Sequence, residues 1–145
     1  MEQEPIATIA HSIQLSVAPV FLLTGIAGML NVLAGRLGRV IDRARVLERT
    51  LAGDTPTDAA SLHERLRTLA TRARWINAAI SLCVGSAILV ALVVVVLFTS
   101  AFWGSDYRGI VAGLFIAAMI ALVGGLVFFL REIRLATSSL RIGQP

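Results

Sequence analysis

Five charged residues follow directly after the first apolar stretch of the chain, and four of them are arginines, which are suited to anion binding. They are Arg36, Arg39, Asp42, Arg43 and Arg45. Arg39 and Arg45 stand three residues on either side of Asp42, a spacing at which exposed helical neighbours form ion pairs worth about 0.2–0.5 kcal/mol. Two interpretations stay open. Either the charges balance one another on a solvated helix, or Arg36, Arg39 and Asp42 ring a cytoplasmic vestibule or bind a lipid phosphate.

Residue types that carry catalysis or hold metals are sparse. The chain has one cysteine, Cys83, and two histidines, His11 and His63, none of which has a partner at metal-ligand spacing. A single cysteine also excludes an intramolecular disulfide. Because an enzyme needs a nucleophile, a base or a metal in a shaped site, we expect no catalytic residues, no metal and no cofactor.

The composition of the chain is that of a membrane protein. Of its 145 residues, 57% are apolar and 15% are charged, whereas soluble domains have about 45–50% and about 25%. Three long intervals contain no Asp, Glu, Lys or Arg, and a spanning helix needs about 20 apolar residues. We therefore expect transmembrane helices at 13–34, 76–102 and 110–130.

The arginines predict how these helices are oriented. All 13 basic residues are arginine, nine of them lie between residues 36 and 74, and none precedes the first span. Basic residues near span ends stay on the cytoplasmic side. The rule places 35–75 and 131–145 in the cytoplasm, and 1–12 and the 103–109 turn outside.

A cleaved signal peptide is the alternative interpretation of the first apolar stretch. Such a peptide begins with positive charge and has a short apolar core. Here the start carries Glu2 and Glu4, and the apolar stretch is long. We therefore expect a retained span.

The segment 35–75 has apolar residues at alternating steps of three and four, which is typical of paired helices. The two series are Leu37, Val40, Ala44, Leu47 and Leu51, and then Leu62, Leu66, Leu69, Ala73, Ile76 and Ile80. Between them, Gly53 can end one helix, and Thr55 with Pro56 can begin the next. The pattern predicts an all-α membrane protein whose first two transmembrane helices extend into a cytoplasmic antiparallel helical hairpin, a short coiled coil.

The hairpin is basic, with nine arginines against five acids in residues 36–74. Nucleic-acid binding would need base-reading or stacking groups on the basic face, and the segment has no aromatic residue before Trp75. We expect no nucleic-acid partner. Instead we expect the arginines to meet anionic lipid headgroups, at about 1 kcal/mol each near the surface.

The first span is less uniformly apolar than the other two. Pro19 removes the hydrogen bond to the carbonyl of Leu15 and bends the helix, so that in lipid this carbonyl needs another partner. Thr24, Gly28 and Asn31 share a face suited to close packing with a polar contact. The candidate pore-lining or packing residues are Gln14, Pro19, Thr24, Gly28 and Asn31.

Residues 12–51 resemble the opening half of a bacterial family catalogued as domain of unknown function 2721. The resemblance is carried by the steps Ala18-Pro19-Val20 and Asp42-Arg43-x-Arg45, together with Ile13-Gln14-Leu15, Thr24, Leu30-Asn31, Leu33, Arg36 and Leu47. The later spans are similar only as hydrophobic helices. The family comprises small integral membrane proteins without an assigned activity. The resemblance therefore implies an integral membrane protein and no mechanism, and we expect its location to be the inner membrane of a bacterium.

Small residues recur every four positions in the third span, a pattern that lets another helix approach closely. They are Gly109, Gly113, Ala117, Ala121 and Gly125. Gly35 and Gly38 mark either a hinge or a close crossing. Three spans bury little surface alone, so we expect a homo-oligomer.

Two functions fit these features. The first is a self-associating structural or partner-binding protein that presents the hairpin to a cytoplasmic protein. The alternative is an oligomeric ion channel or small-solute pore lined by Gln14, Thr24 and Asn31, favouring anions because arginines stand at its cytoplasmic mouth. We prefer the first function, because the hairpin is a definite feature whereas a pore requires an oligomer.

Overall fold

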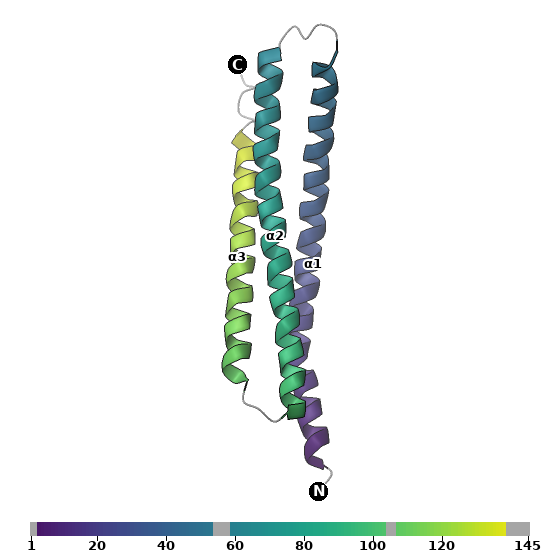
Figure 1. Cartoon of the computed structure of the whole chain (residues 1–145), viewed down its shortest axis with the longest axis vertical. Coiled ribbons are helices and arrows are strands. Elements are labelled where there is room, and N and C mark those ends of the chain that lie inside the picture. The colour runs from purple at the N-terminus through teal and green to yellow at the C-terminus, as the bar shows by residue number, and fades with distance from the viewer. Residues whose placement is uncertain (1–2, 54–58, 104–106, 139–145) are drawn as a thin grey trace. The chain divides into compact units, whose positions relative to one another are not determined.

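The computed structural model describes residues 3–53, 59–103 and 107–138, and these form three α-helices (Figure 1). The helices are α1 (Gln3–Leu51), α2 (Ala59–Trp103) and α3 (Arg108–Ser138), and the described ranges contain no strand. All three are long and apolar enough to cross a membrane, over Val17–Leu51, Ala59–Ser100 and Arg108–Arg134. The prediction of an all-α chain with three such helices is confirmed.

The helix ends follow local sequence signals. After Leu51 the amide of Ala52 donates to the carbonyl of Glu48 (3.1 Å) and that of Gly53 to Thr50 (3.4 Å), so α1 ends beside the predicted glycine. The predicted start of the next helix at Thr55 and Pro56 lies outside the described residues. The helix α1 continues through Pro19 without ending there.

The helix α3 is longer than the third apolar stretch. It continues to Ser138, whereas the apolar stretch ends at Leu130. Its last two turns therefore carry charged residues, beginning with Arg131 and Glu132. The side chain of Glu132 is buried inside the protein, whereas that of Arg131 is exposed.

The chain forms two compact units, each built from parts of all three helices. The first unit comprises Met1–Leu30 and Leu82–Val123. Its buried apolar residues are Ile26, Cys83, Val90, Val93 and Ala118. Its one buried polar side chain among the described residues is Ser86, whose hydroxyl donates to the carbonyl of Ala118 on the facing helix (2.8 Å).

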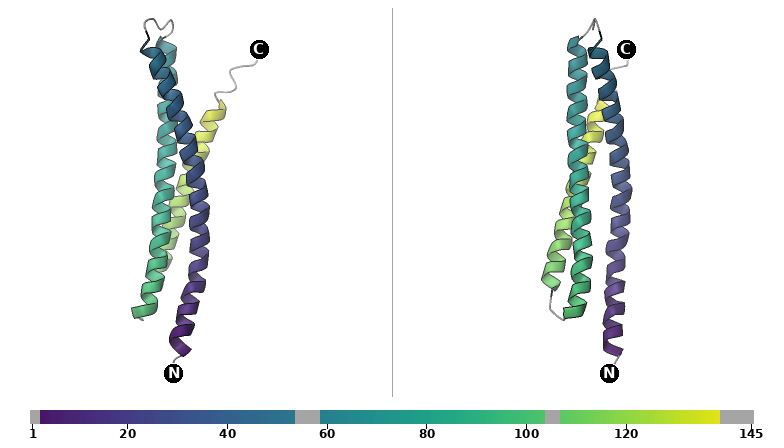
Figure 2. Two further views of the ribbon diagram at one scale, coloured as in Figure 1. Left: turned by 90° about the vertical axis from the view of Figure 1, so that its right-hand side faces the viewer. Right: turned by 45° about the vertical axis from the view of Figure 1, so that its right-hand side comes forward.

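The second unit comprises Asn31–Ser81 and Gly124–Pro145. Within it, residues 31–51 of α1 and 59–81 of α2 lie side by side in every view (Figures 1 and 2). The two apolar series predicted from the spacing are buried or half-buried at every member. The core of this unit contains Leu33, Val40, Leu69, Ile76 and Ala79, and one charged side chain, Glu132.

Buried residues recur at intervals of seven, which keeps one stripe of a helix against its neighbours. The stripes are Pro19, Ile26, Leu33 and Val40 in α1, Leu69, Ile76, Cys83 and Val90 in α2, and Ala118, Gly125 and Glu132 in α3. A carboxylate therefore occupies a position on the stripe of α3 that an apolar side chain would normally fill.

Candidate functional site

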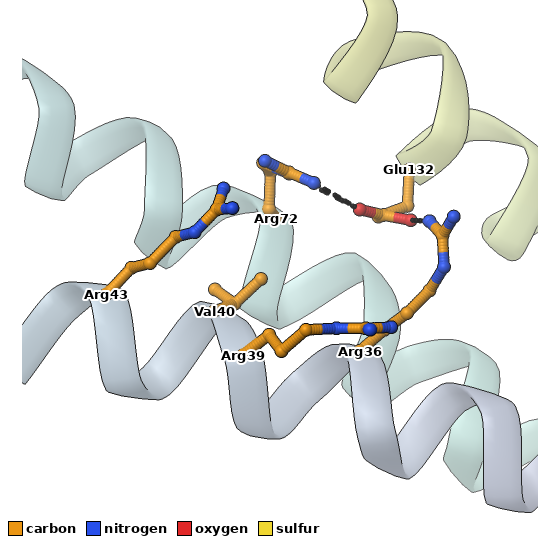
Figure 3. A pocket seen from close by; sticks show the side chains of 6 residues that line it. All are labelled: Arg36, Arg39, Val40, Arg43, Arg72 and Glu132. Carbon is orange, nitrogen blue, oxygen red and sulfur yellow. Dashed lines mark hydrogen bonds and ion pairs between the residues drawn. The ribbon is translucent and has the colours of Figure 1, made fainter.

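The carboxylate of Glu132 is paired with two arginines, one from each of the other helices (Figure 3). Nη1 of Arg36 lies 2.6 Å from Oε2 of Glu132, and Nη2 of Arg72 lies 2.8 Å from Oε1. Nε of Arg72 donates a second, longer hydrogen bond to Oε1 (3.3 Å). We call these three residues the arginine–glutamate cluster. It joins α1, α2 and α3 within the second unit.

The sequence positions all three side chains on packed helix faces. Arg36 follows Leu33 by three residues, and Arg72 follows Leu69 by three, so each arginine lies one turn from a buried apolar residue on the same face. An arginine can pack its apolar stem there while its guanidinium reaches a partner. Glu132 follows the buried Gly125 by seven residues, which returns its side chain to the stripe of α3.

One arginine of the cluster, Arg36, lies over an aromatic ring of the same unit, and so does Arg131. The guanidinium carbon of Arg36 lies 5.3 Å from the ring centroid of Phe129, and that of Arg131 lies 5.7 Å from Trp75. The rings of Trp75 and Phe128 are 5.4 Å apart. Cation–π contacts of this kind contribute about 0.5–1 kcal/mol at exposed sites. The guanidinium of Arg36 therefore has two partners, the ring of Phe129 and the carboxylate of Glu132.

The energetics of the cluster are dominated by burial of the negative charge. The side chain of Glu132 is only 1% exposed, whereas those of Arg72 and Arg36 are 18% and 32% exposed. An ion removed from water costs several kcal/mol unless paired and hydrogen-bonded. Three hydrogen bonds offset that cost here, and no buried side-chain nitrogen or oxygen of the described residues lacks a partner. Because both arginines keep some contact with solvent, one face of the cluster stays open.

That open face belongs to a pocket of about 290 Å³, which we call the arginine pocket. It is lined by Arg36, Arg39, Val40, Arg43, Arg72 and Glu132 (Figure 3). The lining contains four guanidinium groups and one carboxylate, a formal excess of three positive charges. Chemically, such a pocket suits binding of an anion with several acceptor oxygens.

The structure brings together only part of the charged group predicted from the sequence. Arg36, Arg39 and Arg43 line the arginine pocket, whereas Asp42 and Arg45 are exposed and do not. Among the described side chains, Asp42 forms no ion pair with Arg39 or Arg45. The acid that pairs with the arginines of this region is Glu132, which is 96 residues from Arg36 in the sequence.

Sequence reasoning missed Arg72 and Glu132. Arg72 counts in the sequence analysis only as one of the nine arginines of residues 36–74, and no prediction includes Glu132. A signal for Glu132 does exist, because it is the one acidic residue after the third apolar stretch and continues the seven-residue spacing of Ala118 and Gly125. For Arg72, the position one turn after Leu69 is the corresponding signal.

The polar residues predicted in the first span lie mostly on the exposed side of α1. Pro19 is buried, whereas Gln14, Thr24, Gly28 and Asn31 are exposed. The hydroxyl of Thr24 donates to the carbonyl of Val20 in its own helix (3.2 Å). A pore lined by these residues would have to form between copies of the chain.

The small residues of the third span do not share one packed face. Gly109, Gly113 and Ala117 are exposed, Ala121 is half-buried and Gly125 is buried. Four-residue steps drift by about 40° each around a helix of 3.6 residues per turn, so the ladder winds from the outside inward. A Cβ atom added at Gly109 or Gly113 would have no neighbour within 4 Å.

The side chains described do not assemble a metal-binding cluster. Within 3–53, 59–103 and 107–138, no three His, Cys, Asp or Glu side chains come close enough to hold a metal ion. The arginine pocket contains no histidine, serine or cysteine. Its chemistry is therefore that of charge and hydrogen bonding.

Three helices of spanning length and apolar composition define the class as a multi-pass α-helical membrane protein. The chain matches the family described as protein of unknown function (DUF2721) over residues 16–142, which is most of its length. The chain belongs to this family, and the resemblance seen in residues 12–51 is confirmed and extends through the later helices. No curated protein and no solved structure matches it.

Proposed function

We propose that this protein is a structural or partner-binding protein of the bacterial inner membrane, which self-associates and presents residues 35–75 as a basic antiparallel hairpin in the cytoplasm. In this proposal the N-terminus lies outside and the C-terminus inside. The distribution of arginines at the span ends supports that orientation. The proposal assigns the chain no catalytic step and no cofactor.

The observation that carries the proposal is the arginine–glutamate cluster. Arg36 and Arg72 stand near the two ends of segment 35–75, and Glu132 holds both from a third helix. Separating the partners of a buried, hydrogen-bonded ion pair strongly destabilises the folded protein, because one charge is then left buried without a partner. The three helices are therefore fixed to one another where the proposed hairpin begins, which is the arrangement a rigid docking surface requires.

Self-association is supported by open faces on two helices. A Cβ atom added at Gly25, Gly28 or Gly35 of α1, or at Gly109 or Gly113 of α3, would have no neighbour within 4 Å. Small residues allow close approach of a second helix in lipid, where packing replaces the hydrophobic effect as the driving force. We propose that helices of other copies occupy these faces.

Topology is tested by thiol labelling. In a Cys83→Ala background, Gly53→Cys places one thiol in the turn after α1. We expect a membrane-impermeant maleimide to label it in inverted membrane vesicles and not in intact cells. Labelling in intact cells would place the segment outside and contradict the proposal.

Self-association is tested by energy transfer between donor-labelled and acceptor-labelled copies in liposomes. We expect transfer to exceed that of randomly distributed monomers and to persist when lipid is added. Gly109→Leu with Gly113→Leu should weaken association about tenfold by blocking close approach. Ala112→Leu enlarges one other exposed position of α3 and is the control for added side-chain bulk. Transfer at the random level in the unmodified protein would refute self-association.

Partner binding is tested by deleting residues 45–66, which removes the end of the proposed hairpin and leaves the arginine–glutamate cluster in place. We expect proteins that copurify with the full chain to be lost. The docking role would be contradicted if the deletion variant still showed energy transfer between copies and still copurified with every one of these proteins.

A second candidate function is an oligomeric pore, and the exposed polar residues of α1 favour it. If Gln14, Thr24 and Asn31 line a pore between copies, Thr24→Val with Asn31→Leu should abolish ion flux into proteoliposomes. Flux that is at background in the unmodified protein, or unchanged in the variant, would exclude the channel.

A further inference from the structure

We propose that the arginine pocket is a binding site for a phosphate group, supplied either by an anionic lipid headgroup or by a phosphate-bearing solute from the cytosol. The inference uses the fixed geometry of the arginine–glutamate cluster and does not require self-association. It goes beyond the proposed structural role because it assigns the pocket a ligand.

The first argument is the imbalance of charge. Glu132 neutralises one of the four arginines that line the pocket, and no acid among the described residues forms an ion pair with Arg39 or Arg43. Like charges gathered in one pocket repel one another. A bound phosphate anion would relieve that repulsion. The pocket volume of about 290 Å³ is just below the range for drug-sized ligands, about 300–1,000 Å³, and suits a small anionic group.

The second argument is the supply of oriented donors. A guanidinium has five N–H donors, and Glu132 takes one from Arg36 and two from Arg72. The other donors of these arginines, and those of Arg39 and Arg43, remain for an anion. Planar guanidinium groups match the oxygen geometry of phosphate by paired hydrogen bonds.

The third argument is preorganisation by the buried carboxylate. Glu132 and the ring of Phe129 hold Arg36, and two hydrogen bonds to Glu132 hold Arg72. Fixing a binding group before the ligand arrives reduces the entropy lost on binding. Glu132 is thus a positioning residue, whereas Arg39 and Arg43, both exposed, are the groups free to move onto the ligand.

The fourth argument is the place of the pocket in the sequence of apolar and polar segments. Arg36 follows the first apolar stretch directly, Arg72 precedes the second by a few residues, and Glu132 follows the third. Trp75, three residues after Arg72, and Phe128, four residues before Glu132, contact each other in a tilted ring pair; aromatic residues are enriched at the membrane–water boundary. In the orientation proposed above, on which this argument rests, the pocket would lie at the depth of the lipid phosphates on the cytoplasmic side.

The test compares two double variants that remove equal charge from the same helix. Arg39→Gln with Arg43→Gln alters the pocket and leaves the ion pairs to Glu132 intact. Arg45→Gln with Arg49→Gln alters exposed residues outside the pocket. All proteins are full-length, and an SDS titration in bicelles checks that each variant folds as stably as the unmodified chain does.

The lipid arm measures motional restriction of spin-labelled phosphatidylglycerol in phosphatidylcholine vesicles. We expect the pocket variant to lower the relative association constant about tenfold, because two arginines near the anionic headgroup are lost. The control variant should change this constant less than twofold.

The solute arm measures binding of inorganic phosphate by calorimetry, with the protein in phosphatidylcholine nanodiscs. We expect saturable binding to the unmodified protein and to the control variant, and none to the pocket variant.

The two arms separate the sources of the phosphate. A pocket-dependent response to the lipid identifies a headgroup, and one to inorganic phosphate identifies a solute; either supports the site. The inference would be overturned if both double variants lowered the relative association constant of the lipid equally and no protein bound phosphate saturably. The arginines would then form only a diffuse basic surface. Energy transfer between copies would be unaffected by that result, so the proposed function would be judged separately.

Discussion

The two compact units each bury one polar side chain between helices, but they satisfy it by different means. In the first unit the hydroxyl of Ser86 donates to a backbone carbonyl of α3, at Ala118. In the second, the carboxylate of Glu132 takes hydrogen bonds from Arg36 and Arg72. A neutral hydroxyl needs one acceptor, whereas a buried charge needs opposite charges as well.

This difference shows what each unit can do. The Ser86 contact uses a carbonyl that any residue would supply, so it fixes helix register with little dependence on side-chain chemistry. The Glu132 contact requires two cations, and those cations leave donors facing a pocket. Burying the charge of Glu132 costs more free energy than burying the hydroxyl of Ser86, and the arginines that offset this cost give the second unit a surface able to bind a ligand.

Removing the carboxylate should have the largest effect. We expect Glu132→Ala to lower the free energy of unfolding by about 3 kcal/mol, because two arginines lose their partner and a void is left. An SDS titration of the protein in bicelles measures the change. Glu64→Ala, at an exposed acid of α2, is the control. A loss no greater than that of the control would show that the cluster does not join the helices.

Removing Arg36 or Arg72 should lower the free energy of unfolding by less than removing Glu132, and the two arginines should differ from each other. Arg72 makes two hydrogen bonds and is less exposed than Arg36, which makes one. We expect Arg72→Ala to lower the free energy of unfolding by about 2.5 kcal/mol and Arg36→Ala by about 1.5 kcal/mol, within the range of about 1.5–3 kcal/mol for hydrogen bonds to charged groups. The same titration ranks them. The reverse order would mean that the contact with Phe129 outweighs the second hydrogen bond.

The neutral contact of the first unit should matter less again. We expect Ser86→Ala to cost about 0.5–1 kcal/mol, the size usual for interhelical hydrogen bonds in membranes. The carbonyl of Ala118 loses one donor but lies within a helix. A cost equal to that of Glu132→Ala would erase the contrast between the two units.

The smallest effect is expected at Asp42. This acid is exposed and forms no ion pair among the described residues. Asp42→Asn should change the free energy of unfolding by no more than about 0.5 kcal/mol, as surface substitutions do. A larger loss in the SDS titration would restore the interpretation in which Asp42 balances the arginines beside it.

Local sequence patterns were sufficient to predict the three helices and their packed faces. The absence of charge over three long intervals predicts three spanning helices because a charge is costly in hydrocarbon. The alternating spacing of residues such as Val40 and Leu69 predicts which faces are packed, since a helix repeats its faces every seven residues. Gly53 marks the end of α1 because a glycine readily ends a helix. All of these signals act over a few neighbouring residues.

The site depended on contacts that local patterns do not encode. The sequence placed Asp42 among arginines at helical spacing, yet the acid that pairs with Arg36 is Glu132, 96 residues away. Spacing along one helix cannot specify which side chain of another helix arrives at the same level. The sequence by itself determined the helices, their apolar stripes and the excess of arginine. Only the tertiary structure decided which charges meet, because pairing across helices depends on their register and on burial that removes competing water.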